Sequence, residues 1–404
     1  MLDINKNKKV KNSIKYASLI IALLIGTVVL EYFGTTGNWT MLIACIKKAS
    51  VYALVAVSMI LLNGFTGLFS LGQAGFMLIG AYTYAILTIP LAQRNMVYYL
   101  YVKPATDIAP AIHPTVQFSL PEILGNAMGG FGMMLGVLIA IILAGLIAAG
   151  LAYLIGLPVL RMRSDYLAIA TLGFAEIIRA IFQWSKFGLL TNGANPLKSF
   201  VTFSSFNIPM FGTTFRFGTF MAVFLAALCI AVIVLLVNSS YGRAFKAIRE
   251  DEVAAEAMGI NLFKHKQLAF CISCFFAGIG GAMLAMFLNN AQANQFKAFM
   301  TYEILMIVVL GGIGSISGSC IAAFLYIFSM EWLLRGLDAG TFIGISLPTI
   351  FRSGFRLVVM SVIILLVILV FRRGLMGDKE LPYYIGRLKE WLSARKRKAG
   401  EQNG

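Results

Sequence analysis

Charged side chains gather in one stretch of this chain, 241–266, which reads YGRAFKAIREDEVAAEAMGINLFKHK and lies between two long apolar runs. It holds nine of the chain's 33 basic and 17 acidic residues. Apolar residues recur there at helical spacing and a glycine follows them, so the stretch predicts a short amphipathic helix that stops at Gly259. The apolar stripe comprises Phe245, Ile248, Ala255 and Met258.

The acidic residues of this stretch nearly balance its basic ones. If the helix rested on lipid headgroups, its acidic side chains would be repelled by anionic lipid. A helix that enters a groove on another protein presents its own charge pattern, which explains the composition better. We therefore expect a protein partner for this stretch, with an interfacial helix as the alternative.

A second charged group lies inside an apolar run. Glu176 and Arg179 stand three residues apart in GFAEIIRA. Charges within a membrane are unfavourable unless they are paired or functional. Their spacing puts both on one helix face and predicts an ion pair between them. Contact with a charged group of a passing solute is the alternative.

Side chains that bind metals or attack substrates do not cluster in the sequence. CISC at 271–274 has the spacing of a redox pair but lies in an apolar run, so buried thiols are expected. His113 and His265 have no neighbouring metal ligands, and no GxxxxGK[ST] phosphate loop occurs. We expect no metal, no catalytic residue and no cofactor in this chain.

The chain is 59% hydrophobic and 12% charged, with a mean hydropathy of +0.84, which is typical of a membrane protein. The charged groups must therefore be positioned by long apolar helices. Repeated runs near the ~20 residues that cross a bilayer predict an all-α polytopic bundle of about ten transmembrane helices. The run 301–333 is one glycine-broken helix or two helices, and its charge context favours two. The expected spans are 14–33, 43–62, 72–91, 131–156, 166–184, 217–237, 267–288, 301–312, 315–333 and 355–371.

Most of the 33 lysine and arginine residues then fall on one side of the membrane, which predicts that both termini are cytoplasmic. We expect a cytoplasmic tail at 1–13, a transmembrane domain at 14–371 and a basic cytoplasmic tail at 372–404. The 92–130 loop would be external and the 238–266 loop cytoplasmic. The net charge of +16 reflects this topology and contact with anionic lipid, rather than nucleic-acid binding.

Several stretches together resemble one known family. AIREDEVAAEAMGIN (247–261) is similar to the cytoplasmic coupling motif of branched-chain amino-acid ABC importer permeases, in particular the larger, M-type member of the permease pair. NGFTGLFSLGQAGFMLIGAYTYAIL (63–87), LRMRSDYLAIATLGFAEIIR (160–179) and VVLGGIGSISGS (308–319) resemble its other signatures, and FRRGLMG (371–377) its usual ending.

The resemblance implies an ABC importer permease fold in the bacterial cytoplasmic membrane and a subunit that does not hydrolyse ATP. Its implied partners are two ABC ATP-binding subunits, which bind ATP and Mg²⁺, a second homologous permease and an external solute-binding protein. The implied substrates are leucine, isoleucine and valine. The residues at the implied ATPase contact are Arg249, Glu250, Glu252, Glu256 and Gly259.

Glycine-rich stretches in both halves of the chain allow broken helices, which mark pathway candidates in transporters. Ordinary tight packing of membrane helices is the alternative. The expected pathway residues are Gly72, Gln73, Thr171, Glu176, Gly311 and Gly312.

Two other functions fit a helical bundle. An ion-coupled carrier usually needs several embedded charges, whereas only Glu176 and Arg179 are expected to be central. A membrane enzyme needs a nucleophile, metal cluster or carboxylate pair, and none has useful spacing. Urea and short amides remain alternative substrates, because their importers share these permease signatures, and other amino acids are a further alternative.

Overall fold

The computed structural model describes residues 26, 31, 39–102, 113–162, 164–210, 213–335, 341–342, 345–346, 354–370, 374–377 and 380. Six helices in this part are long and apolar enough to cross a membrane. The predicted polytopic helical fold is confirmed, whereas the count of about ten spans and the cytoplasmic termini stay predictions. The predicted span 14–33 and the tails 1–13 and 372–404 lie largely outside the described residues.

A helix lies at each predicted span from 43 onward. The long ones are α2 (Trp39–Ile60), α5 (Leu120–Val159), α6 (Ser164–Gln183), α8 (Gly218–Val237), α11 (Leu262–Leu288) and α13 (Ile316–Phe328), which continues as a π-helical turn, η5 (Ser329–Leu333). The shorter ones are α3 (Gln73–Thr88), α12 (Ala298–Gly311) and α15 (Phe355–Val370).

Two short antiparallel ribbons accompany the helical bundle in the described part of the chain. One joins β1 (Asn207–Met210) to β2 (Thr213–Arg216), and the other joins β3 (Thr341–Phe342) to β4 (Ile345–Ser346). The first contains threonine, isoleucine and phenylalanine, which favour extended backbone.

The centre of the bundle is formed by α2 and α11, whose residues are mostly buried, and α11 packs against α2, α3 and α5. Glycines make the α3–α11 crossing possible. A β-carbon on Gly80 would lie 1.9 Å from the Gly278 carbonyl oxygen, and one on Gly281 would lie 1.9 Å from that of Met77. The two backbones therefore touch, as small residues permit in membrane helices.

The 40-residue helix α5 is two helices joined by a sharp turn at Gly129, whose φ is 66°. The first, shorter part folds back along the second, because a β-carbon on Gly132 would lie 1.9 Å from the Leu124 carbonyl oxygen. Only the second part continues the predicted span 131–156, and it extends to Val159.

The run 301–333 forms two separate helices, α12 and α13, which pack against each other. The turn between them uses Gly312, whose φ is 108°. A β-carbon on Gly311 would lie 2.5 Å from the Ser319 α-carbon, so the helices meet without side chains between them. With 14 residues, α12 spans about 21 Å and is shorter than the hydrocarbon core of about 30 Å.

Residues near the end of the chain complete this turn. Leu375 N–H donates to Leu310 O over 2.8 Å and Met376 N–H donates to Gly311 O over 3.2 Å. The Glu380 carboxylate accepts the first N–H groups of α13, those of Ile316 (2.9 Å) and Ser317 (3.1 Å). The last carbonyls of α12 and the first N–H groups of α13, which have no partner within their own helix, thus gain hydrogen bonds.

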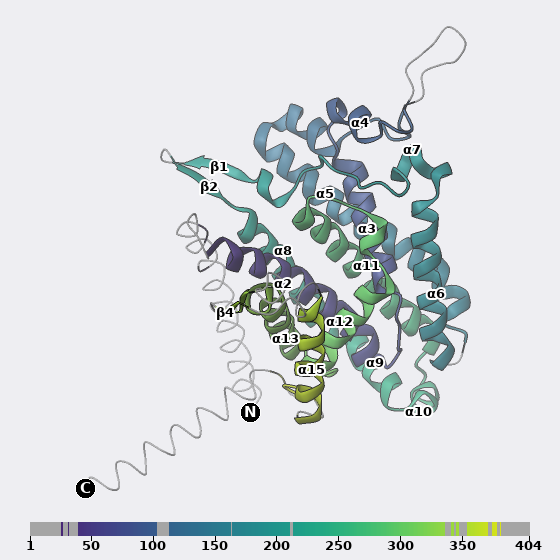
Figure 1. Ribbon diagram of the computed structural model, residues 1–404. Helices are drawn as coiled ribbons and strands as arrows, with labels where there is room; N and C mark the ends of the chain where they lie inside the picture. Colours follow the sequence, from purple (N-terminus) through teal and green to yellow (C-terminus); the bar gives the residue numbers. More distant parts are fainter. Residues whose placement is uncertain are drawn as a thin grey trace, which may run out of the picture.

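Short elements close the two ends of the bundle (Figure 1). At one end lie α9 (Ser240–Glu250) and α10 (Glu252–Ala257), and at the other lie α4 (Leu91–Val97) and α7 (Gly188–Thr191). The α4 and α7 segments are joined, since Tyr98 Oη donates to Leu190 O over 2.9 Å.

The α4 segment is held by a buried arginine. The Arg94 guanidinium donates to Ile86 O (2.8 Å), Ile89 O (3.2 Å) and Phe118 O (2.5 Å), and also to Val116 O. Burial lowers the pKa of Arg94, and the nearby Tyr98 and Glu122 partly offset this decrease. The described part of the 92–130 loop is therefore an ordered structure tied to the end of α3.

Candidate functional site

The first glycine-rich stretch forms a broken helix. The chain leaves α2 through a π-helical turn, η1 (Leu61–Phe65), and has no helix again until Gln73. Side chains of distant helices satisfy the backbone where α3 begins. Leu71 N–H donates to Thr171 Oγ1 over 3.0 Å, and Ala74 N–H donates to Thr301 Oγ1 over 3.1 Å.

Further hydroxyl groups complete a buried polar cluster at this helix start. Gln73 Nε2 donates to Ser58 Oγ over 2.7 Å, and Ser273 Oγ donates to Ser58 O over 2.6 Å. We call this the hydroxyl cluster, made of Ser58, Gln73, Thr171, Ser273 and Thr301. It joins α2, α3, α6, α11 and α12 at one place inside an otherwise apolar bundle.

Three predicted pathway residues meet here. A β-carbon on Gly72 would lie 3.0 Å from Thr171 O, and Gln73 follows directly in the cluster. Gln73 and Thr171 are each only 2% exposed, so in this chain they face neighbouring helices. Gly311 and Gly312 lie apart from them, at the opposite end of α12 from Thr301.

The predicted ion pair between Glu176 and Arg179 is confirmed, with 2.6 Å between Oε2 and Nη2. The other carboxylate oxygen of Glu176 accepts the Ala298 N–H over 3.2 Å and so caps the start of α12. The side chains are still 37% and 24% exposed, respectively. This pair lies within a candidate membrane span yet is only partly covered by its own chain.

The charged stretch 241–266 forms two short helices, α9 and α10, where one was expected, and ends in the first turn of α11. Asp251 breaks the helix with extended backbone, and its carboxylate caps α10 by accepting the Val253 (2.9 Å) and Ala254 (3.1 Å) N–H groups. Gly259 ends α10 as predicted, with a φ of 83°. Gly259 N–H donates to Glu256 O and Ile260 N–H to Ala255 O, which is the Schellman pattern.

The break changes which residues are buried. Phe245, Ile248 and Ala255, three of the four residues of the predicted apolar stripe, are buried within this chain, whereas the stripe was expected to meet a partner protein or lipid. The prediction that Met258 shares this stripe was wrong, because that side chain is 83% exposed, beside Val253 at 78%. A single continuous helix would have kept Met258 on the inner stripe, whereas the turn at Asp251 reorients α10.

Three of the five predicted ATPase-contact residues, Arg249, Glu250 and Glu252, have partners within the chain. Arg249 Nη1 donates to Gly64 O over 3.0 Å, and its Nη2 pairs with Glu250 at 2.6 Å. Glu252 pairs with Lys266, also at 2.6 Å. Glu250, Glu256 and Gly259 are exposed at the end of the bundle.

Arg249 ties this end of the bundle to the broken helix. Its aliphatic stem packs on Gly67, which has a φ of 75°. A β-carbon on Gly64 would lie 2.1 Å from Ile313 O, in the turn between α12 and α13. The stretch 241–266, the broken helix and the α12–α13 turn therefore meet, although they are far apart in sequence.

Two charged groups inside the bundle were missed by the sequence analysis, which treated Glu176 and Arg179 as the central charges. Glu303 accepts hydrogen bonds from Tyr52 Oη (3.5 Å) and Tyr326 Oη (3.2 Å). Lys48 forms an ion pair with Glu331. Glu303 and Glu331 lie in apolar runs of the sequence, as Glu176 does, and this position could have identified them as charges within the membrane.

No three His, Cys, Asp or Glu side chains come together as metal ligands among the residues that the structure describes. The side chains of the hydroxyl cluster are neutral amide and hydroxyl groups, bonded to nearby backbone or, for Gln73 and Ser58, to each other.

Comparison with known proteins identifies the family. Residues 41–371 match the model of the family described as branched-chain amino acid transport system / permease component. LivM, a high-affinity branched-chain amino acid transport system permease protein, is 32% identical in Escherichia coli and 31% in Salmonella typhimurium, each over 81% of this chain and 70% of the relative. The LivH permease of Salmonella typhimurium is 29% identical over 44% of this chain and 52% of its own.

No solved structure matches. The family match covers most of the chain, including the hydroxyl cluster, the Glu176–Arg179 pair and the 241–266 stretch. This chain belongs to the permease family of branched-chain amino acid transport systems.

Proposed function

We propose that this chain is one of two permease subunits of an ATP-driven importer in the bacterial cytoplasmic membrane, and that it carries leucine, isoleucine and valine inward. The similarity to LivM over most of both chains supports the substrate. The similarity to LivH supports a second, related permease. In this proposal both termini and the 238–266 loop are cytoplasmic, and the 92–130 loop receives a solute-binding protein.

The observation that carries the proposal is the exposed surface of α10. Val253 and Met258 are large, apolar and almost fully exposed at one end of the bundle, and exposed Glu250 and Glu256 flank them. An apolar centre with a charged rim is typical of a protein docking surface. We propose that this surface docks into a groove of an ATPase subunit. That subunit, and not this chain, would bind ATP and Mg²⁺.

Arg249 would transmit movement of the docked helix inward, because it bonds to the Gly64 carbonyl at the start of the broken helix. We expect Arg249→Met to reduce uptake about tenfold, the equivalent of one charge-assisted hydrogen bond. ATP hydrolysis should persist, since the α10 surface is untouched. The measurement is the ratio of solute moved to ATP hydrolysed in the reconstituted transporter.

Arg243→Met is the matched control for Arg249, because Arg243 lies exposed on the same helix and, among the described residues, bonds locally to Ser240. It should leave that ratio unchanged. Equal loss of uptake and hydrolysis in the Arg249 variant would show that Arg249 serves ATPase docking and not transmission.

The partly exposed pair Glu176–Arg179 suggests where the second permease lies. Lipid tails do not tolerate a charged pair, so the face of α6 that carries it needs a polar neighbour or water. Around it the face is apolar and contains Gly173, which has open space beside it. We assign this face to the permease–permease contact and to the solute path, which Glu176 would line, with the buried hydroxyl cluster in the layer of helices behind it.

We expect Glu176→Gln to lower stability by about 1–3 kcal/mol, between the values for exposed and buried ion pairs, because Arg179 and the first N–H of α12 lose their charged partner. Solute preference should change less. Thermal unfolding of the purified assembly and competition among solutes measure the two effects.

A double variant, Glu176→Gln with Arg179→Met, is the matched control because it removes both charges. It should recover part of the lost stability. A folded, stable Glu176→Gln transporter with a new solute preference would instead assign Glu176 to substrate selection.

Reconstitution tests the whole proposal. The chain alone in vesicles should move no amino acid under an H⁺ or Na⁺ gradient, and uptake should need the ATPases, the second permease and the binding protein. Leucine, isoleucine and valine should compete with one another, and urea and short amides should not. Gradient-driven leucine uptake by the chain alone would mean an ion-coupled carrier, for which Glu303 would be the first residue to examine.

A further inference from the structure

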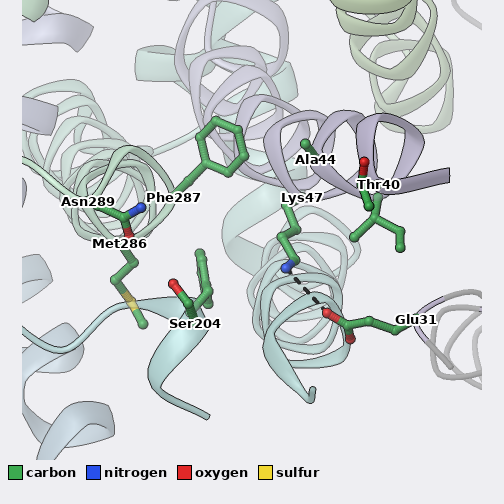
Figure 2. A pocket seen from close by; sticks show the side chains of 10 residues that line it. Glu31, Thr40, Ala44, Lys47, Ser204, Met286, Phe287 and Asn289 are labelled. Atoms are coloured by element: carbon green, nitrogen blue, oxygen red, sulfur yellow. Dashed lines mark ion pairs between the residues drawn. The ribbon is translucent and has the colours of Figure 1, made fainter. Parts of the chain in front are cut away.

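A cavity of about 260 Å³ opens at the end of the bundle opposite α9 and α10. Its walls come from the first half of α2, the end of α11 and a 3₁₀ turn, η3 (Phe203–Ser205). Figure 2 shows Lys47 and Glu31 facing each other on one side, with Phe287 and Asn289 on the other. The site is separate from the hydroxyl cluster and from α10.

The cavity contains one basic and one acidic group. Lys47 Nζ lies 3.3 Å from Glu31 Oε1. Glu31 is held in place by α8, since its Oε1 accepts the Thr219 hydroxyl (2.7 Å) and both oxygens accept the Thr219 N–H (3.2 Å). An ammonium has three donors, of which Lys47 uses one on Glu31. Each carboxylate oxygen has about two acceptor positions, and among the described residues Glu31 Oε2 accepts only the Thr219 N–H, so this oxygen keeps one position for a ligand.

The remaining walls are mostly apolar. Ile43, Phe203, Met286 and Phe287 line the cavity, and Ser204 and Asn289 add polar atoms. The volume lies just below the 300–1,000 Å³ of ordinary ligand sites, which limits the occupant to a small group. A charge pair beside apolar walls complements a zwitterion that carries an apolar chain.

We propose that this cavity binds the zwitterionic head of an amphiphile, with the anionic group on Lys47, the ammonium group on Glu31 and the apolar part against Phe203 and Phe287. Two sources supply this chemistry. One is a free amino acid such as leucine, and the other is the headgroup of phosphatidylethanolamine. The choice of leucine rests on the proposed function, whereas the site itself does not.

Binding is measured on the purified full-length chain in an uncharged maltoside detergent. One arm titrates radiolabelled leucine. The other follows thermal unfolding with added phosphatidylethanolamine, using phosphatidylglycerol, which lacks the ammonium group, for comparison. Lys47→Met removes the cation, and Ala44→Phe fills the cavity while keeping both charges. Lys198→Met is the matched control, because Lys198 is exposed and does not line the cavity.

We expect Lys47→Met and Ala44→Phe each to weaken binding at least about tenfold, the equivalent of a lost charge-assisted contact, and Lys198→Met to leave it unchanged. This pattern with leucine identifies an amino-acid site. The same pattern with phosphatidylethanolamine alone identifies a lipid site. If Lys47→Met does not fold, Ala44→Phe decides.

The inference is overturned if neither ligand binds, or if binding survives both substitutions. Leucine uptake by the assembled transporter is measured in parallel. Uptake without binding at this cavity rejects the site and keeps the proposed function. Binding at the cavity without ATP-driven uptake keeps the site and rejects the proposed function.

Discussion

Val253→Asp combined with Met258→Asp should abolish uptake by the reconstituted transporter. Val253 on α10 and Met258 directly after it are largely exposed, and there they would anchor the ATPase. Losing two apolar anchors and adding two charges beside Glu250 and Glu256 should weaken docking at least a hundredfold, since each interface anchor contributes about 2 kcal/mol or more. Co-purification of the ATPase with the chain and ATP-driven leucine uptake measure the effect.

The double variant should still insert and fold, because neither side chain packs against the bundle. Ser240→Asp is the control, since it adds an acid at the exposed start of α9, where a negative charge is tolerated. It should leave docking and uptake near their original levels. Unchanged ATPase binding by the double variant would remove α10 as the docking surface.

Gly80→Leu should prevent the chain from folding. The β-carbon alone would lie 1.9 Å from a backbone oxygen of Gly278, and backbone at the centre of the bundle cannot move aside as a side chain can. The loss of stability should therefore exceed the roughly 3 kcal/mol that is usual for overpacking. Yield of monodisperse protein after detergent extraction, followed by gel filtration, measures it.

The matched control is Gly150→Leu. Gly150 is an exposed glycine in α5 with no atom within 4 Å of its would-be β-carbon. The same substitution there should preserve yield and raise helix propensity. Normal folding of Gly80→Leu would mean that α3 and α11 do not cross as closely as described.

Local patterns in the sequence predicted much of the fold. Apolar run length located the helices from 43 onward, and Gly259 was identified as the end of α10 because the Schellman turn needs a residue that adopts positive φ. The Glu176–Arg179 pair followed from helical spacing. These features depend on neighbours within one or two turns.

Features that depend on distant segments were not predictable in the same way. The hydroxyl cluster joins Thr171 and Thr301 to backbone at 71–74, and no local pattern states which hydroxyl meets which N–H. Met258 was misplaced because Asp251 looked like one acid among several, whereas its carboxylate starts a new helix. Glu303 was passed over because its tyrosine partners lie on α2 and α13.

The Glu380 contact to α13 has a consequence for biosynthesis. Its carboxylate and the Ile316 N–H are 64 positions apart in sequence, so at about 5–20 residues per second the ribosome adds this cap roughly 3–13 s after the helix start. Until then the first N–H groups of α13 and the last carbonyls of α12 lack these partners. Residues synthesised near the end of translation thus finish a hairpin made well before them, and a chain that terminates before 374 leaves that hairpin incomplete at both helix ends.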